Sequence, residues 1–153
     1  MSDDRVRSST ADDVNAQLDH RRRVDVAAYV SADDRTIRRR LVELDREWDT
    51  ERVLEANAAV ITLAAVSLGA AHSRRWLALA GVVPAFLLQH ALQGWCPPLE
   101  LIRRLGVRTR QEIDAERTAL KALRGDFDGV SMAGRADAPL AVAEMALAAA
   151  RRR

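Results

Sequence analysis

The chain has 153 residues, 48% of them hydrophobic and 30% charged, and a formal net charge of +2. This length fits one domain or one compact membrane unit, and so small a net charge gives no ground for a nucleic-acid ligand. A single cysteine excludes an intrachain disulfide and a multi-cysteine metal site, and no motif in the sequence predicts a metal or a cofactor.

Charge is distributed in three parts along the chain. Between residues 56 and 95 the only charged side chains are those of Arg74 and Arg75, whereas both flanks are densely charged. The pattern predicts an all-α membrane protein in which a two-helix transmembrane hairpin is flanked by cytoplasmic amphipathic helices. A soluble helical bundle with two very apolar core helices is the rival interpretation.

The amino-terminal flank divides into two segments. Residues 1–30 are polar with sparse apolar positions and are predicted to be mobile. Residues 31–49 are predicted to form a juxtamembrane amphipathic helix, capped by Ser31. Its apolar face repeats at three and four residues and consists of Ile37, Leu41, Leu44 and Trp48.

Residues 50–124 are predicted to contain the hairpin, a short interfacial helix and a charged helix. Residues 76–95 lack formal charge and are long enough to cross about 30 Å of hydrocarbon, with Trp76 and Trp95 placed to anchor the two interfaces, as Trp48 is on the flank. Residues 56–71 form the shorter span, and only four residues separate the two. The arginines near the spans number nine on the two flanks and two in the turn, which predicts a bacterial inner-membrane protein with both termini cytoplasmic.

The second span is followed by a proline-rich junction and a second charged segment. Gly106 is predicted to end the short interfacial helix, and Thr109 to cap a helix that runs to about Arg124. The apolar stripe of that helix, Ile113, Leu120 and Leu123, is expected to dock on the other flank helix. Residues 125–153 are predicted to be a linker and a basic tail.

Polar side chains gather where the first span begins and the second ends. In an antiparallel hairpin these two points lie at one membrane face, so we expect a polar cluster of Asn57, Gln89, His90 and Gln93 there. Such a cluster serves either a function or interhelical hydrogen bonding. Small residues at four-residue spacing also permit close approach of a second copy, and these are Ala65, Gly69, Gly81 and Ala85.

Cys96 is the one candidate for a catalytic side chain. It precedes a short helix, whose dipole favours a thiolate, so it is either a cytoplasm-facing nucleophile or a small structural residue at a helix start.

The residues from the end of the second span to the next helix carry a resemblance. The stretch "LQGWCPPLELIRRLGVRT" after two short apolar spans resembles the YgaP-like inner-membrane family, and the similarity covers roughly residues 50–110. The residues that carry it are Gly94, Trp95, Cys96, Pro97, Leu105, Gly106 and Thr109. The resemblance implies a membrane hairpin that anchors and dimerises. The rhodanese half of the family's name-giving member has no counterpart here, so its sulfurtransferase activity is not carried over.

These observations lead to one main hypothesis and two alternatives. The main hypothesis is a non-catalytic membrane adaptor or assembly subunit that contacts the lipid bilayer and forms a homo-oligomer. The first alternative is a thiol accessory, with Cys96 acting in sulfur transfer or redox relay beside a separate sulfurtransferase. The second is a soluble interaction module.

Overall fold

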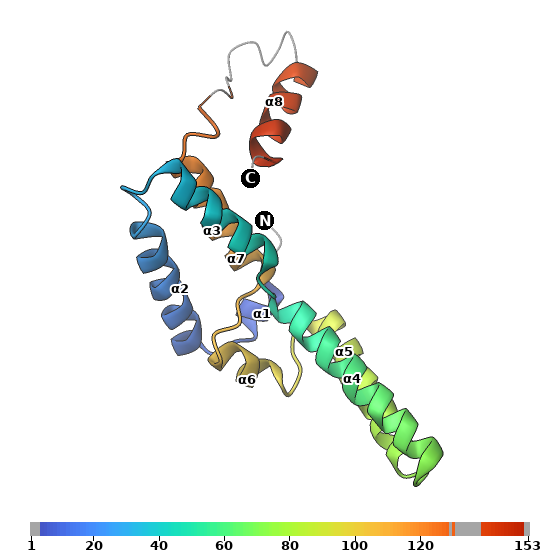
Figure 1. Ribbon diagram of the computed structural model, residues 1–153. Coiled ribbons are helices and arrows are strands. Elements are labelled where there is room, and N and C mark those ends of the chain that lie inside the picture. Colours follow the sequence, from blue (N-terminus) through green and yellow to red (C-terminus); the bar gives the residue numbers. More distant parts are fainter. Residues whose placement is uncertain (1–3, 129, 131–138, 152–153) are drawn as a thin grey trace. The chain divides into compact units, whose positions relative to one another are not determined.

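The computed structural model describes residues 4–128, 130 and 139–151, and within these residues the chain forms helices and no strand (Figure 1). The chain divides into two compact units: unit 1 comprises residues 1–19 and 48–111, and unit 2 comprises residues 20–47 and 112–153. The helices are α1 (Arg5–Ser8), α2 (Asp12–Ala27), α3 (Asp34–Arg46), α4 (Thr50–Ala71), α5 (Trp76–Gln93), α6 (Leu99–Arg104), α7 (Arg110–Leu123) and α8 (Pro139–Arg151). The all-α fold class with two apolar helices is confirmed.

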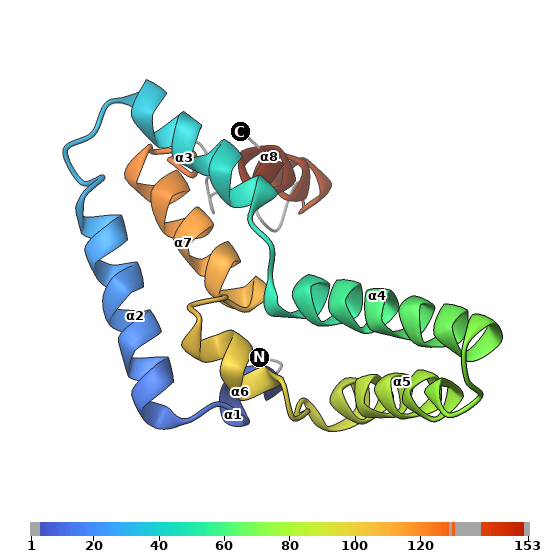
Figure 2. The ribbon, with the colours of Figure 1, turned by 60° about the horizontal axis from the view of Figure 1, so that its bottom comes forward.

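In unit 1, α4 and α5 lie side by side as an antiparallel hairpin, as both ribbon views show (Figures 1 and 2). Ala65 and Gly69 of α4 are buried, and a Cβ added to Gly69 would lie 2.5 Å from Leu77 Cδ2. The small residues of α4 therefore serve the contact inside the hairpin. Of the predicted small-residue surface, only Gly81 and Ala85 on α5 remain exposed.

Both hairpin helices are long and apolar enough to cross a membrane. Their apolar side chains are mostly exposed: Leu63 is 68% exposed on α4, and Leu88 is 62% and Leu92 69% exposed on α5. A core helix of a soluble bundle buries such side chains. The exposure therefore favours helices that face lipid over the core helices of a soluble bundle.

A small apolar core lies where the hairpin joins the rest of unit 1. Its buried members come from α1, α4, α6 and the junction after α5, and they are Val6, Leu54, Cys96, Leu99 and Ile102. Each element supplies only one or two apolar side chains to this core. Unit 1 is therefore held together at the end of the hairpin where α4 begins and α5 ends, here called the base of the hairpin.

Residues 1–30 are predicted to be a mobile segment, and the described part of this segment, residues 4–30, contains two helices. Residues 5–8 and 12–27 are helical, and Val6, Val14 and Leu18 are buried. Asp4 caps α1 by accepting a hydrogen bond from the Arg7 backbone N–H at 3.1 Å. The segment has few apolar residues, but Val6 packs in the core at the base of the hairpin, among residues far along the chain, and Val14 and Leu18 lie one turn apart on α2.

Unit 2 is built on α3 packed against α7. Ile37, Leu41 and Leu44 of α3 are buried together with Ile113 and Leu120 of α7, which confirms that the two flank helices dock on each other. Beside this core, Arg40 Nε donates to Glu116 Oε1 at 2.9 Å, and Glu116 is fully buried. The apolar stripes and this ion pair together join the two helices of unit 2.

Three details of the predicted flank helices are wrong. The cap of α3 is Asp33, whose carboxylate accepts from the Thr36 N–H at 2.9 Å, and Ser31 lies before it. Trp48 is 53% exposed because α3 ends at Arg46 and the chain is extended at the next residue, so Trp48 leaves the helical face. Leu123 is 43% exposed at the last residue of α7.

The carboxyl-terminal region begins at Gly125, whose φ of +77° ends α7 in the left-handed conformation. The predicted linker falls mostly on residues 131–138, and the end of the basic tail on residues 152–153, all of which lie outside the described residues. The tail before them is the helix α8, and Lys121 Nζ donates a hydrogen bond to the carbonyl of Ala150 within it.

Candidate functional site

At the base of the hairpin, hydrogen bonds join the first residues of α4 to the segment that follows α6. Asp49 caps α4, with its carboxylate accepting from the Arg52 N–H at 2.8 Å. The backbone N–H and the hydroxyl of Thr50 both donate to the Arg108 carbonyl, at 2.9 and 3.0 Å. Because Arg108 follows α6, these bonds tie the segment after the second span to the start of the first.

Gly94 ends α5 with φ of +77°, a left-handed conformation that L-residues rarely adopt. A Cβ at this position would lie 2.6 Å from the Arg5 Cβ and 2.8 Å from the Arg5 carbonyl oxygen. Arg5 Nη1 in turn donates to the carbonyls of Ala91 at 3.1 Å and Leu92 at 3.4 Å, near the end of α5. Glycine is therefore required here both for the turn and for the close approach of α1.

The Cys96 side chain is buried in the core at the base of the hairpin and is 2% exposed. Its carbonyl accepts the Leu99 N–H at 3.0 Å, so it stands at the start of the turn that leads into α6. Burial raises the pKa of the Cys96 thiol, against a smaller opposite effect of a hydrogen bond from the Leu99 backbone. This environment favours the neutral thiol, which is a poor nucleophile.

The four residues of the predicted polar cluster differ in burial and in hydrogen-bond partners. His90 is 8% exposed, and its Nδ1 has no hydrogen-bond partner among the described residues. Asn57 is exposed, and its amide donates to the Val53 carbonyl of its own helix at 2.7 Å. Gln89 is partly buried and Gln93 is exposed. Only His90 is therefore buried at the base of the hairpin.

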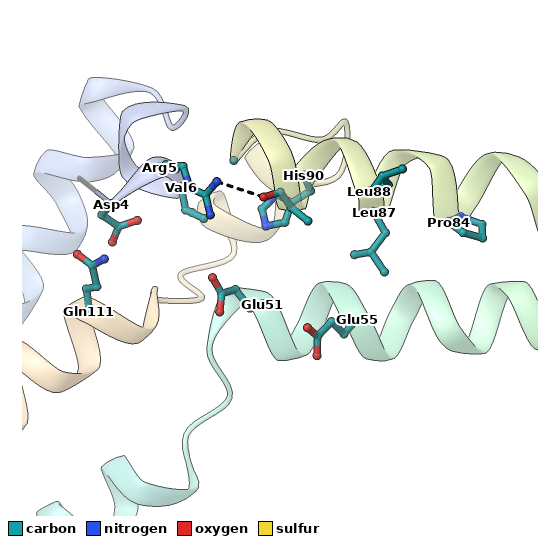
Figure 3. A pocket seen from close by; sticks show the side chains of 12 residues that line it. Asp4, Arg5, Val6, Glu51, Glu55, Pro84, Leu87, Leu88, His90 and Gln111 are labelled. Atoms are coloured by element: carbon teal, nitrogen blue, oxygen red, sulfur yellow. Dashed lines mark hydrogen bonds between the residues drawn. The ribbon is translucent and has the colours of Figure 1, made fainter. Parts of the chain in front are cut away.

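A cavity of about 680 Å³ opens between α1, α4 and α5 at this level (Figure 3). Its charged or titratable lining includes Arg5, Glu51, Glu55 and His90, and Leu87 contributes to an apolar wall. Glu51 projects from α4 toward α5, and Leu87 projects from α5 toward α4 (Figure 3). The cavity thus joins carboxylates, a guanidinium and an unpartnered imidazole nitrogen beside apolar surface.

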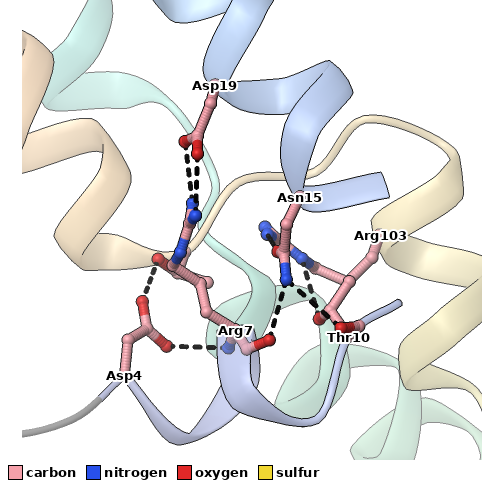
Figure 4. A network of polar contacts seen from close by, with 7 residues as sticks. Asp4, Arg7, Thr10, Asn15, Asp19 and Arg103 are labelled. Carbon is pink, nitrogen blue, oxygen red and sulfur yellow. Dashed lines mark hydrogen bonds and ion pairs between the residues drawn. The ribbon is translucent and has the colours of Figure 1, made fainter. Parts of the chain in front are cut away.

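A polar network that the sequence did not reveal holds α1 and the first part of α2, residues 12–19, in unit 1 (Figure 4). Arg103 of α6 is fully buried and donates to Thr10 Oγ1 at 3.3 Å, to Asn15 Oδ1 at 3.1 Å and to the Val107 carbonyl at 3.1 Å. Its basic neighbours made it look like part of a solvated face. The only available signal was the four-residue spacing of Val14 and Leu18, which fits a helix that needs a partner.

The three tryptophans are all exposed, at 53% for Trp48, 38% for Trp76 and 44% for Trp95. Trp48 and Trp95 lie just before α4 and just after α5, and the Arg52 guanidinium carbon lies 4.9 Å from the centre of the Trp48 ring. Exposed indole rings at the ends of apolar helices are typical of a membrane interface. Their role as membrane anchors remains a prediction.

Within the described part of the chain, no group of three or more His, Cys, Asp or Glu side chains is arranged to hold a metal ion. The chemistry that the site offers is instead ion pairing and hydrogen bonding at the base of two apolar helices. Of the residues named from the sequence, the structure places His90 on the cavity and Cys96 in the adjoining core.

Comparison with known families agrees with this geometry. Residues 49–112 match the family described as inner membrane protein YgaP-like, transmembrane domain. Neither the curated proteins nor the solved structures contain a match. The match begins at Asp49, the cap of α4, and covers α4, α5 and α6 completely. This match over residues 49–112, together with the two candidate spans, supports a bacterial inner-membrane protein.

Proposed function

We propose that this protein is a non-catalytic membrane adaptor that works as a homo-oligomer, with both flanks of the hairpin in the cytoplasm. The α4–α5 hairpin anchors it, and the α3–α7 pair of unit 2 is the part available to other proteins. The observation that carries the proposal is the outward direction of the hairpin's apolar side chains, combined with burial of the only thiol. Such a hairpin gains its contacts from lipid and from further helices.

The face of α5 that supports self-association alternates steps of three and four residues. It is exposed along its length and consists of Ala78, Gly81, Ala85, Leu88 and Leu92. A Cβ added to Gly81 would meet no atom within 4 Å, so a second helix can approach its backbone closely. Small residues at such spacing favour helix packing in lipid, where association depends on close contact rather than on a hydrophobic driving force.

The alternative of a thiol accessory, acting with a separate sulfurtransferase, needs a reachable thiolate. Cys96 is 2% exposed, and its burial raises the pKa of the thiol. Both observations favour a structural Cys96 over a sulfur or redox relay. Because the Cys96 side chain is buried, we do not expect it to form a crosslink between two copies.

Cysteine crosslinking in native membranes tests the proposal. In a Cys96→Ala background, Ala85→Cys should give a disulfide-linked dimer under mild oxidation. Leu79 is also exposed on α5, but it lies about a third of a turn around the helix axis from Ala85. Leu79→Cys should therefore give much less disulfide-linked dimer. Equal crosslinking at the two positions, or a monomer mass by native mass spectrometry from mild detergent, would remove the homo-oligomer from the proposal.

The anchoring part of the proposal has its own test. The full-length protein should stay with membranes through an alkaline carbonate wash, and reagents that do not cross the membrane should label a cysteine placed at Ser73 in the turn but not one placed at Ser31. Labelling of Ser31→Cys from the periplasmic side would reverse the proposed orientation.

A further inference from the structure

His90 leaves an unsatisfied group on the cavity at the base of the hairpin. The side chain is 8% exposed and lines the cavity, and its Nδ1 has no hydrogen-bond partner among the described residues. Buried polar atoms in folded proteins are almost always paired, so an unpaired one beside a cavity points to a missing ligand. A ligand that donates a hydrogen bond to Nδ1 would satisfy it.

The charge of the cavity favours a cation. Glu51 and Glu55 stand one turn apart on α4, and like charges at this spacing repel each other. Asp4 adds a third carboxylate, but it already accepts from the Arg7 N–H at 3.1 Å and from the Thr109 hydroxyl at 2.6 Å. The two glutamates are therefore the natural acceptors for a cationic group. The described residues hold no cluster suited to a metal ion, and an ammonium group needs no fixed coordination geometry.

One basic group stands on the same cavity. Arg5 Nη1 donates to the carbonyls of Ala91 and Leu92, which fixes the guanidinium at the end of α5. A guanidinium has five N–H donors, so Nε and Nη2 are available to an anionic oxygen. Acceptors for a cation and donors for an anion therefore line one cavity, which suits a zwitterion.

The remaining lining is apolar and comes from the span itself. Pro84, Leu87 and Leu88 of α5 line the part of the cavity farther from the base. Trp48 and Trp95, both exposed, flank the base, which is therefore the predicted level of the lipid headgroups. A ligand with a zwitterionic end at this level and an apolar end toward the spans is a phospholipid. The volume of about 680 Å³ is within the usual range for a small-molecule site.

We propose that this cavity binds phosphatidylethanolamine by its headgroup. The primary ammonium donates to Glu51, Glu55 and His90 Nδ1, the phosphate accepts from Arg5, and an acyl chain lies along Leu87 and Leu88. This site shares Leu88 with the self-association face, but its charged residues lie outside that face, and the proposal does not depend on the adaptor role. A protein that does not bind this lipid would still show the same oligomeric state, which can be measured on the same sample.

The first test needs no variant. The full-length protein, purified in mild detergent and stripped of lipid, is titrated with phosphatidylethanolamine and with phosphatidylcholine of identical acyl chains, and bound lipid is counted by native mass spectrometry. Phosphatidylcholine has the same charges but no N–H donor. We expect phosphatidylethanolamine to bind at least tenfold more tightly, and affinities within twofold of each other would overturn the proposal.

Two variants and a matched control test whether the cavity residues cause the preference for phosphatidylethanolamine over phosphatidylcholine. The double variant Glu51→Gln, Glu55→Gln should reduce the ratio of the two affinities to below threefold. His90→Phe should also reduce this ratio. Glu100→Gln changes a glutamate of unit 1 outside the cavity and should retain it fully. Protection of Cys96 from alkylation checks that each variant is folded. A double variant that is folded and retains the full preference would refute the site.

A final arm separates lipid from the free headgroup. Soluble phosphoethanolamine, added in hundredfold excess, should not displace the bound lipid, because it lacks the acyl chain that contacts α5. Displacement at comparable concentrations would instead assign the cavity to a soluble amine phosphate and overturn the lipid assignment.

Discussion

Replacing Gly94 by alanine should open the base of the hairpin. An L-residue in the left-handed conformation costs about 1–2 kcal/mol. The new Cβ would also lie 2.6 Å from the Arg5 Cβ and 2.8 Å from its carbonyl oxygen, and these atoms cannot rotate away as a long side chain can. Forcing α1 outward adds about 1–3 kcal/mol, the usual cost of overpacking. We expect a total loss of about 3 kcal/mol.

Cys96 provides the assay, because it is the only cysteine, lies two residues from Gly94 and shares a buried cluster with Val6 of α1. When a buried thiol reacts through local opening, each 1.4 kcal/mol lost in protection raises the rate about tenfold. Gly94→Ala should therefore speed alkylation of Cys96 about a hundredfold in mild detergent, as followed by intact mass.

Gly81→Ala is the matched control, since a Cβ there meets nothing within 4 Å, and it should change the rate less than twofold. The reasoning is refuted if Gly94→Ala reacts within threefold of the unchanged protein.

Three other outcomes are expected. Arg103→Leu removes a fully buried guanidinium and leaves its acceptors unpaired, so unit 1 should lose about 2–4 kcal/mol, seen as faster proteolysis of residues 5–19. Leu120→Ala should destabilise unit 2 by about 2–4 kcal/mol in thermal unfolding, whereas Leu123→Ala, at a 43% exposed position, should cost below about 1 kcal/mol. Burial raises the pKa of Cys96, so the stability gained from its neutral thiol is complete below about pH 8.5 and is lost as pH rises through the raised pKa. The rate of Cys96 alkylation should therefore keep rising above about pH 8.5. A rate that levels off near this pH would contradict the raised pKa that burial causes.

The parts of the fold that local pattern determines could be predicted. The spans followed from hydropathy, and α5 begins at Trp76 as expected. Apolar residues at helical spacing were enough to pair α3 with α7, because each stripe is complete within one helix. Gly106 lies just after the last turn of α6 as predicted, with a φ of +88°, because helix capping depends on residues within a few positions.

The parts that depend on distant residues could not be predicted. Arg103 is 93 positions from Thr10 and 88 positions from Asn15 in the sequence. No local pattern in the first twenty residues could therefore predict that these two side chains bind Arg103. The cavity was missed for a similar reason. His90 was singled out as polar at membrane depth, but Arg5 and Glu51 lie on other elements, and no spacing in the sequence connects them.

The buried guanidinium of Arg103 also has a consequence for the order in which the protein assembles. Thr10 and Asn15 leave the ribosome before either span, and Arg103 leaves it after both. Unit 1 therefore cannot close while the chain is still being inserted. A chain whose second span failed to insert would hold Arg103 on the opposite side of the membrane from these two acceptors. Its early helices would then stay open to proteases, so closure of this one network reports that the hairpin has been inserted with both ends on the same side.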